Sequence, residues 1–295
     1  MLVLETADEV KRFLTERGWV PPDAPVRVEP LGGGVSNQAW KIEGPHFRYV
    51  MKQALAKLKV KADWFSDVER IEREKAALEA AGPLLGEEHV PQVVRYDARE
   101  HALLMTCAPE DAVPWKQRLM AGEFGGGAAA TAGQLLGRLH ARSAAMEAEL
   151  RGAFEDLKFF EQLRLDPFYR HVQRRYPELD RPVGVLIGQL AEERTCLVHG
   201  DYSPKNMLTA PAGRLIVLDY EVAHWGNPVF DLAFCTAHLM LKGFALGREA
   251  DAADLAAAFL NGYASGAGGG IDAGGGGSPH SDGQSSQAGG LSPHF

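Results

Sequence analysis

The sequence predicts an α+β protein with two lobes, the first built on strands and the second on helices. Short segments of alternating apolar residues, bounded by turn residues, recur through the first 109 residues. Apolar residues at helical spacing dominate residues 110–265. We therefore expect an N-terminal antiparallel five-stranded sheet with a helix over residues 1–109, followed by a larger, mainly helical C-terminal lobe over residues 110–265.

Capping boxes and alternation define the elements of the N-terminal lobe. Thr6 and Glu9 form a capping box that opens a short amphipathic helix ending near Gly18. Ser66 and Glu69 form a second one, which predicts a helix over residues 66–81. The five strands are expected at residues 26–31, 39–42, 47–54, 90–96 and 102–107.

The C-terminal lobe is expected to consist of helices around one short hairpin. The helices are predicted at residues 128–150, 156–176, 183–193, 231–241 and 250–263. Residues 266–295 contain 11 of the 33 glycines in the chain. Such a segment cannot bury enough apolar area to offset its ordering entropy, so we predict a disordered tail.

The composition indicates a cytoplasmic protein. Hydrophobic residues make up 45% of the chain and charged residues 24%, as in ordinary soluble proteins. The net charge of −8 argues against a nucleic-acid binder, which needs clustered Lys and Arg. Cys107, Cys196 and Cys235 stand singly in apolar contexts, which favours reduced, buried thiols. No signal peptide and no uncharged apolar stretch of about 18 residues is found, so we expect no membrane contact. We expect a monomer or homodimer.

The chemistry is concentrated in residues 197–234. An apolar run leads into His199-Gly200-Asp201, and four residues separate Asp201 from Asn206, which is the H-x-D-x-x-x-x-N spacing of a kinase catalytic loop. A second apolar run ends at Asp219, and a Pro-Ala-Gly turn at 211–213 joins the two halves. We therefore expect Asn206 and Asp219 at neighbouring ends of one hairpin.

These residue types suit phosphoryl transfer. Mg²⁺ takes oxygen ligands, so Asp219 would supply a carboxylate oxygen and Asn206 an amide oxygen. Asp201 would orient the attacking hydroxyl and accept its proton. His199-Gly200-Asp201 alone also fits a turn with a buried histidine. A metal hydrolase built on His199 and Asp201 is a further alternative, although no H-E-x-x-H motif or Cys pair supports it.

The chain resembles the aminoglycoside phosphotransferase and choline kinase superfamily, which are small-molecule kinases with a bilobal protein-kinase-like fold. The residues that carry the resemblance are His199-Gly200-Asp201, Asn206, Asp219-Tyr220-Glu221 and Gly226-Asn227-Pro228-Val229-Phe230-Asp231-Leu232-Ala233. The resemblance implies ATP and Mg²⁺ as cofactors. It also implies structural support from His199, Glu221 and Asp231, of which Asp231 would hold the backbone of the catalytic loop.

The resemblance also implies a nucleotide site in residues 1–109. The glycine loop, with Gly33, Gly34, Ser36 and Asn37, would cover the phosphates, although three glycines alone favour a flexible hairpin turn. Lys52 would contact the phosphates and pair with Glu74, which lies on the inner face of the 66–81 helix; Glu72 is the fallback partner. The backbone of Met105 and Cys107 would bind adenine.

The resulting hypothesis is an ATP-dependent phosphotransferase that moves the γ-phosphate of Mg-ATP to a hydroxyl of a small molecule. A protein kinase is disfavoured because only eleven residues separate Asp219 from Asp231, which leaves no room for an activation segment. A pseudokinase that binds a nucleotide without transfer remains the alternative. Members of the superfamily usually continue with further C-terminal helices, so the 266–295 tail is either natural or the product of a truncation or frameshift.

The acceptor stays open between aminoglycoside, amino-alcohol and sugar-like compounds. Lys205, just before Asn206, is expected to face the transferred phosphate or an anionic acceptor, or to be a surface lysine. Three acidic pairs favour a cationic acceptor instead: Glu87-Glu88, Glu110-Asp111 and Glu192-Glu193.

Overall fold

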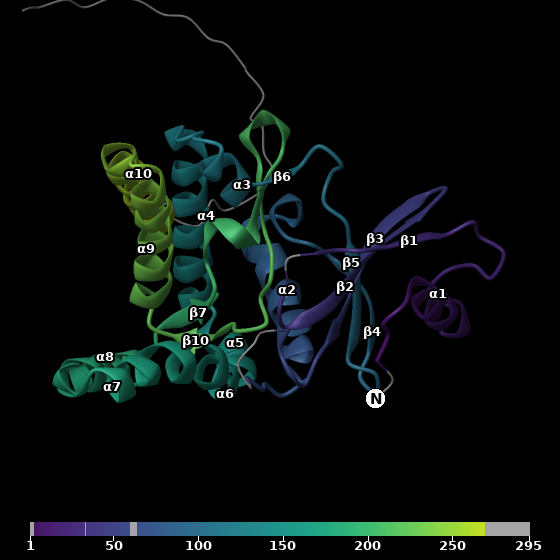
Figure 1. Cartoon of the computed structure of the whole chain (residues 1–295), viewed down its shortest axis with the longest axis horizontal. Helices are drawn as coiled ribbons and strands as arrows, with labels where there is room; N and C mark the ends of the chain where they lie inside the picture. The colour runs from purple at the N-terminus through teal and green to yellow at the C-terminus, as the bar shows by residue number, and fades with distance from the viewer. Residues whose placement is uncertain (1–2, 33, 60–63, 269–295) are drawn as a thin grey trace, which may run out of the picture.

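The computed structural model describes residues 3–32, 34–59 and 64–268. It has the two predicted lobes, with a β-sheet on one side and a helical body on the other (Figure 1). Helix α1 (Ala7–Glu16) begins at the predicted capping box, in which Glu9 N–H donates to Thr6 Oγ1 and Thr6 N–H donates to Glu9 Oε2. It buries Val10, Phe13 and Leu14, so α1 belongs to the core of the first lobe.

The N-terminal sheet is antiparallel and has five strands, as the sequence predicts. Its spatial order is β1-β2-β3-β5-β4, and every neighbouring pair runs antiparallel. In the register of the three inner strands, Lys52 lies opposite Ala39 on one side and Leu103 on the other. The strands are β1 (Arg27–Pro30), β2 (Asn37–Gly44), β3 (Phe47–Ala54), β4 (Val93–Asp97) and β5 (Ala102–Thr106).

Helix α2 (Arg70–Leu85) lies between the sheet and the helical lobe (Figure 1). It begins four residues later than the predicted Ser66. The Ser66 hydroxyl donates to Gln162 Oε1 at 2.9 Å instead of capping the helix, and the residue that precedes α2 makes no side-chain cap. A partner 96 positions away thus displaces the helix start.

The C-terminal lobe contains more helix breaks than the sequence predicts. The expected 128–150 helix is two helices that meet at Met146, and the expected 156–176 helix contains the π-helix η2. Its helices are α3 (Trp115–Met120), α4 (Gly126–Ala145), α5 (Glu147–Phe154), α6 (Lys158–Phe160), η2 (Glu161–Arg170), α7 (His171–Arg175), α8 (Asp180–Glu192), α9 (Val229–Leu246) and α10 (Glu249–Gly268). Short 3₁₀ turns are η1 (Glu87–His89), η3 (Pro177–Leu179), η4 (Pro204–Asn206) and η5 (Pro211–Gly213).

Two small antiparallel ladders hold the segment with the kinase-type motif. Strand β7 (Cys196–Val198) pairs with β10 (His224–Gly226). Strand β8 (Met207–Thr209) pairs with β9 (Leu215–Val217) and, on its other side, with β6 (Val113–Pro114). The β8–β9 pair is the hairpin that the sequence predicts, with its turn at Pro211–Gly213.

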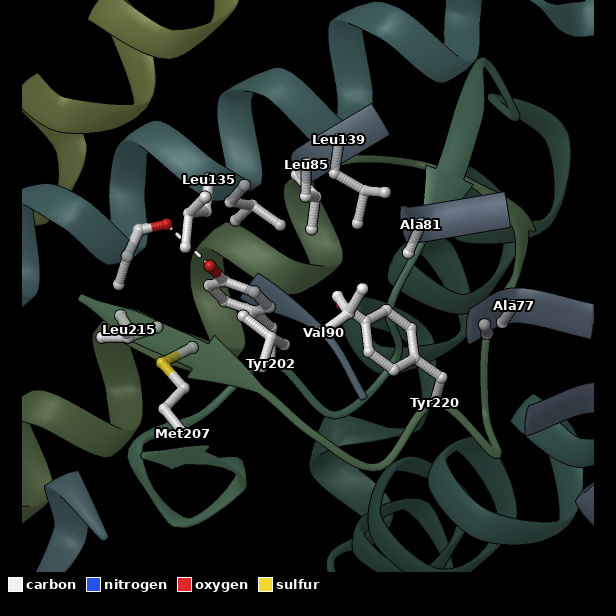
Figure 2. Packing of buried hydrophobic residues seen from close by; sticks show 14 of the residues in the cluster. Ala77, Ala81, Leu85, Val90, Leu135, Leu139, Tyr202, Met207, Leu215 and Tyr220 are labelled. Atoms are coloured by element: carbon white, nitrogen blue, oxygen red, sulfur yellow. Dashed lines mark hydrogen bonds between the residues drawn. The ribbon is translucent and has the colours of Figure 1, made fainter. Parts of the chain in front are cut away.

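One hydrophobic cluster runs from the first lobe into the second. It includes Ala77, Ala81 and Leu85 of α2 together with Leu135 and Leu139 of α4 (Figure 2). Tyr202, from the loop that follows β7, inserts into it and donates its hydroxyl proton to Ala132 O at 2.7 Å. The loop that carries the predicted catalytic residue is therefore anchored in the main core.

Helices α4 and α10 approach so closely that their backbones touch. A Cβ added to Gly133 would lie 2.0 Å from Phe259 O, and one added to Gly262 would lie 2.2 Å from Ala130 O. Gly266 is equally close to Gln134 O, although the sequence places residue 266 in the tail. Helix α10 therefore extends to Gly268, and the rest of the predicted tail lies outside the described residues.

Within the described part of the chain, α9 is the one helix long and apolar enough, by length and composition alone, to cross a membrane. A third of that stretch is buried, and its first turn carries the fully buried Asp231. Cys235 and Leu239 on the same helix also pack in the main core. Length and hydropathy therefore do not by themselves make α9 a membrane span.

Candidate active site

The turn after β7 has a backbone shape that only glycine suits. Gly200 has φ of +78°, and a Cβ there would lie 2.7 Å from Val222 O. A side chain at this position would therefore be strained and would also clash with the segment before β10. This turn carries His199 and Asp201 on either side of Gly200.

Asp231, at the start of α9, holds this turn by its backbone. Its two carboxylate oxygens accept the amide hydrogens of His199, at 2.7 Å, and of Gly200, at 2.9 Å. His140 of α4 lies 3.3 Å from the same carboxylate. Burial opposes ionisation of Asp231, but these hydrogen bonds and the nearby histidines lower its pKa. The carboxylate is thus held charged beneath the turn.

The His199 ring links the two halves of the motif. Nε2 donates to Leu218 O at 3.0 Å, and Nδ1 accepts the amide hydrogen of Asp201 at 3.1 Å. Only a neutral ring with its proton on Nε2 satisfies both contacts. Burial lowers the pKa of His199, which is consistent with this neutral form. His199 therefore fixes the position of Asp201 relative to the strand end that precedes Asp219.

Three donors converge on one oxygen of Asp201. Oδ2 lies 2.7 Å from Asn206 Nδ2, 2.9 Å from an Arg164 guanidinium nitrogen and 2.9 Å from Lys205 Nζ. Arg164 also donates to Gly200 O at 2.7 Å, so it clamps the same turn from η2. In the described residues no hydrogen bond reaches Oδ1, which is the oxygen left to face a substrate hydroxyl.

Asn206 and Asp219 lie at the adjoining ends of the β8–β9 hairpin, where Leu218 N–H donates to Asn206 O at 2.8 Å. The Asn206 amide group donates to Asp201, which leaves its Oδ1 available to a cation. Asp219 has φ of +70°, a conformation rare outside glycine and common at functional sites. Two oxygen donors of this kind fit Mg²⁺ that completes its shell with phosphate oxygens and water.

No group of three or more His, Cys, Asp or Glu side chains able to hold a metal occurs in residues 3–32, 34–59 and 64–268. A cation at this hairpin would therefore take most of its ligands from a bound nucleotide and water, as Mg²⁺ commonly does.

Lys52 of β3 connects the lobes. Its Nζ lies 2.5 Å from Glu74 Oε1 on α2 and 2.8 Å from Asp219 Oδ1. Burial opposes the charge of Lys52, but the two carboxylates raise its pKa, so it stays protonated. Burial raises the pKa of Glu74 to about 7, whereas the pKa of Asp219 is lowered, against the effect of burial, by Lys52 and Lys205. Glu72, the fallback partner, is exposed.

Arg70 and Glu221 form a second connection between the lobes, which the sequence did not reveal. Arg70 is completely buried and donates to Glu221 Oε2 at 3.1 Å. Its other nitrogens donate to the carbonyls of Ser36, Leu55, Ser66 and Asp67. One side chain thus ties the end of the glycine loop and the segment before α2 to the D-x-E segment.

The described residues of the glycine loop contact one another and the D-x-E segment. Gly33 lies outside the described residues, and Gly34 is exposed with open space around its Cα. Asn37 Nδ2 donates to Glu221 Oε2 at 2.9 Å and to Ser36 Oγ at 3.1 Å. Ser36 and Asn37 therefore brace the base of the loop.

At the end of β5, a backbone group predicted to bind adenine already makes a hydrogen bond within the protein. Met105 lies within the sheet, paired with Val50 and Val93. The Cys107 amide donates to Arg48 O at 3.2 Å, so adenine would have to replace that partner. Cys107 is half-buried, whereas Cys196 and Cys235 are buried, and all three thiols are free.

Sequence reasoning missed Arg70, His140 and Arg164. Arg70 stands four residues before Glu74 on the inner face of α2, and that spacing was a usable signal. His140 follows the buried leucines of α4, and a buried polar residue at that place implies a hydrogen-bond partner. No local signal marks Arg164, which stands among several arginines.

This arrangement defines a protein-kinase-like phosphotransferase site on a two-lobed fold. The sequence profile of the phosphotransferase enzyme family matches residues 27–271, so the chain belongs to that family. A search of curated protein sequences found no match.

Solved structures with the same fold are distant in sequence. A choline/ethanolamine kinase family protein from Mesorhizobium loti superposes with a TM-score of 0.56 at 16% identity, over 88% of this chain and 76% of that chain. The choline kinase LicA from Streptococcus pneumoniae gives 0.51 at 17% identity, over 86% and 80%. The ternary complex of streptomycin, ATP and APH(2″)-IIa gives 0.51 at 15% identity, over 89% and 85%.

Proposed function

We propose that this phosphotransferase transfers the γ-phosphate of Mg-ATP to a hydroxyl group of a small molecule. The observation that carries the proposal is Lys52, which reaches Asp219 at 2.8 Å from the opposite lobe while Glu74 holds it at 2.5 Å. An ammonium group beside a cation-binding carboxylate is the arrangement that a triphosphate requires. A similar fold has been solved with ATP bound to APH(2″)-IIa, which supports the choice of nucleotide.

Each proposed role follows from the position of a side chain. Mg-ATP supplies, when bound, the transferable group and the cation that neutralises its charge. Asn206 and Asp219 would hold the cation, and Lys52 would contact the phosphates. Asp201 would orient the acceptor hydroxyl through Oδ1 and accept its proton. Asp231 and His199 act on the backbone that carries Asp201 and are positioning residues.

The test is ATP consumption by the purified protein across a panel of hydroxyl compounds, with Asp201→Ala beside it. Turnover that depends on one acceptor and disappears in the variant supports the proposal. The variant must still gain thermal stability from Mg-ATP, because only a ligand of the folded state raises its melting temperature. Wild-type protein that neither binds Mg-ATP nor consumes it would contradict the proposal.

One observation favours a second candidate, a nucleotide-binding module without transfer. Arg164, Lys205 and Asn206 all occupy Oδ2 of Asp201, and such a clamp could keep the carboxylate from a substrate. Mg-ATP binding without turnover on any acceptor would favour this candidate. Turnover that rises in Arg164→Gln would indicate instead that the clamp only restrains an active base.

A further inference from the structure

A group of cationic side chains begins at Asp201 and continues into the helical lobe. Arg164 and Lys205 contact the Asp201 carboxylate directly, each at 2.9 Å. Lys242 and His238 lie on α9, and Lys116 lies on α3. We call Arg164, Lys205, Lys242 and Lys116 the basic cluster. The three elements α3, η4 and α9, which carry Lys116, Lys205 and Lys242, contact one another, and Arg164 reaches Asp201 from η2.

Lys242 is the unusual member, because it is buried without a carboxylate partner. Its exposed fraction is 8%, and its Nζ donates to the carbonyl of His238 at 3.0 Å, within its own helix. No salt bridge to Lys242 occurs in the described residues. A buried ammonium group normally has a counter-ion. Lys242 therefore leaves a positive charge without compensation.

The surroundings of Lys242 increase this imbalance. Burial first, and then the charges of Lys116 and Lys205, lower the pKa of Lys242 to about 8. The pKa of the neighbouring His238 is lowered to about 4, by burial first and then by Lys242, with Lys205 and Arg164 also contributing. Among the carboxylates, only Asp201 acts on His238 in the opposite direction. Asp201 thus faces Arg164 and Lys205 directly, and Lys242 lies within reach of the charges of Lys205 and Lys116.

The nucleotide phosphates would have a different partner under the proposed function. Lys52, Asp219 and Asn206 mark the side of Asp201 on which a Mg-nucleotide would bind. Lys205 is 48% exposed and lies between the two sides, since it contacts Asp201 and also lowers the pKa of Asp219. Lys242 and Lys116 come from helices of the C-terminal lobe. Their charges are therefore available to the other substrate.

The acidic pairs that favoured a cationic acceptor make contacts elsewhere. Glu88 lies beside His89, Glu110 approaches Arg48 of the sheet at 3.9 Å, and Glu193 accepts from Asn227. None of the six residues is among the charges that act on His238 or Lys242. The three acidic pairs therefore supply no counter-charge to Lys242.

We infer that the acceptor is an anion: a small hydroxyl compound with a carboxylate or phosphate group, which the basic cluster binds while the hydroxyl faces Asp201. The inference rests on the proposed function, because it names the substrate class of the same site. Lys242 and Lys116 would bind the anionic group, and Lys205 would bridge the acceptor and the transferred phosphate. This anion would supply the counter-charge that Lys242 lacks.

Three-carbon probes that differ mainly in charge test the inference without nucleotide. Glycerate and glycerol 3-phosphate are anionic, glycerol is neutral, and serinol is cationic. Thermal shift and calorimetric titration of the full chain should show both anions binding at least about tenfold more tightly than glycerol or serinol, a difference of about 1.4 kcal/mol. Added salt should weaken the binding of the anions. Equal or tighter binding of glycerol or serinol overturns the inference, as does absence of anion binding up to about 50 mM.

Variants identify the residues responsible. Lys242→Met keeps the aliphatic volume and removes the charge, and Lys116→Gln removes an exposed charge without risk to the core. Each should weaken glycerate binding about five- to tenfold. Lys11→Gln on the exposed face of α1 removes one positive charge elsewhere and should change nothing. If Lys11→Gln has the same effect as Lys242→Met, the binding is non-specific and the inference fails.

Mg-ATP binding separates this inference from the proposed function. Lys242→Met should leave the affinity for Mg-ATP unchanged. If the variant instead lost affinity for Mg-ATP and kept its affinity for glycerate, the basic cluster would belong to the nucleotide site and the inference would be overturned. Wild-type protein that binds anions but neither binds nor consumes Mg-ATP would contradict the kinase while the anion site stands. Wild-type protein that phosphorylates only cationic or neutral compounds would contradict the anionic acceptor while the kinase stands.

Discussion

Nε of Arg70 lies 3.1 Å from Oε2 of Glu221, although 151 positions separate the two residues, and both side chains are buried. Arg70 stands at the start of α2 in the first lobe, and Glu221 follows the predicted cation ligand Asp219 in the second. The pair therefore joins the lobes within two residues of the site. The family motif includes Glu221 but does not indicate that this residue joins the two lobes.

Loss of this pair should destabilise the whole protein. Arg70→Met leaves the Glu221 carboxylate buried with Asn37 as its remaining partner, so we expect the free energy of unfolding to fall by about 3–5 kcal/mol. Denaturant unfolding measures the change, with Arg12→Met on the exposed face of α1 as the control. The double variant Arg70→Met/Glu221→Gln should lose less than the sum of the single variants. Strict additivity would show that the two side chains do not interact.

The contact between Lys52 and Glu74 should produce a pH-dependent effect. Burial raises the pKa of Glu74 to about 7, so the carboxyl group carries a proton below that pH and a negative charge above it. The charged form holds the Lys52 ammonium group by charge attraction as well as by a hydrogen bond, whereas the protonated form offers a hydrogen bond alone. Glu74→Gln resembles the protonated form, so the rates of variant and wild type should be close at pH 6.

At pH 8.5 the wild-type rate should exceed the Glu74→Gln rate about tenfold, which corresponds to about 1.4 kcal/mol of transition-state stabilisation. Steady-state ATP consumption measured from pH 6 to 8.5 checks the trend. Glu72→Gln changes an exposed carboxylate on the same helix and serves as the matched control. A gap that stays constant across this range would contradict the role assigned to the ionised Glu74.

Asp231→Asn should reduce turnover more than substrate binding. The carboxylate accepts the amide hydrogens of His199 and Gly200, one on each oxygen, whereas a carboxamide has a single acceptor oxygen. One backbone amide then loses its partner and the turn before Asp201 shifts. We expect kcat to fall about 100-fold, with little change in the KM for ATP. Asp254→Asn on α10 provides an exposed control, and an equal fall in both variants would exclude a positioning role.

The sequence predicts those features that local patterns encode. The β8–β9 hairpin and the five strands follow from alternation and turn residues. The approach of Lys52 to Glu74 follows from the helix face of Glu74 together with the family resemblance. The start of α2 was predicted four residues early, because Ser66 bonds to Gln162 across the fold. Arg70 was marked by its place on the inner face of α2, but its partner Glu221 comes near only in the folded chain. Arg164 acts through long-range contacts that leave no periodic trace in the sequence.

The unpaired ammonium group of Lys242 should cost stability in a pH-dependent way. Its pKa is lowered to about 8 in the folded protein, against 10.5 for an ordinary lysine. Between these values the unfolded chain binds the proton and the folded chain does not, so stability rises with pH in this window. Below about pH 8 the penalty of the buried charge is complete. Lys242→Met should therefore raise the melting temperature more at pH 7 than at pH 10. An equal rise at both pH values would contradict the lowered pKa of Lys242.

The glycine contact between α4 and α10 should determine whether the second lobe stays assembled. A Cβ at residue 133 would lie 2.0 Å from Phe259 O, a backbone atom that cannot move without displacing α10. We expect Gly133→Ala to lower the free energy of unfolding by about 1–3 kcal/mol or more, as overpacking does. Tyr263 on α10 contacts His140, which in turn contacts Asp231, so the strain should also reach the turn before Asp201.

Gly188→Ala in α8 is the matched control, because that glycine is helical and has open space around its Cα. It should stabilise the protein by about 0.5–1 kcal/mol through helix propensity alone. Thermal and denaturant unfolding should therefore show that the same glycine-to-alanine change lowers stability at residue 133 and raises it at residue 188. If Gly133→Ala also stabilised the protein, α4 and α10 would not pack as closely as the structure shows. The contact of Gly266 with α4, which supports an ordered helix at that residue, would then also be in doubt.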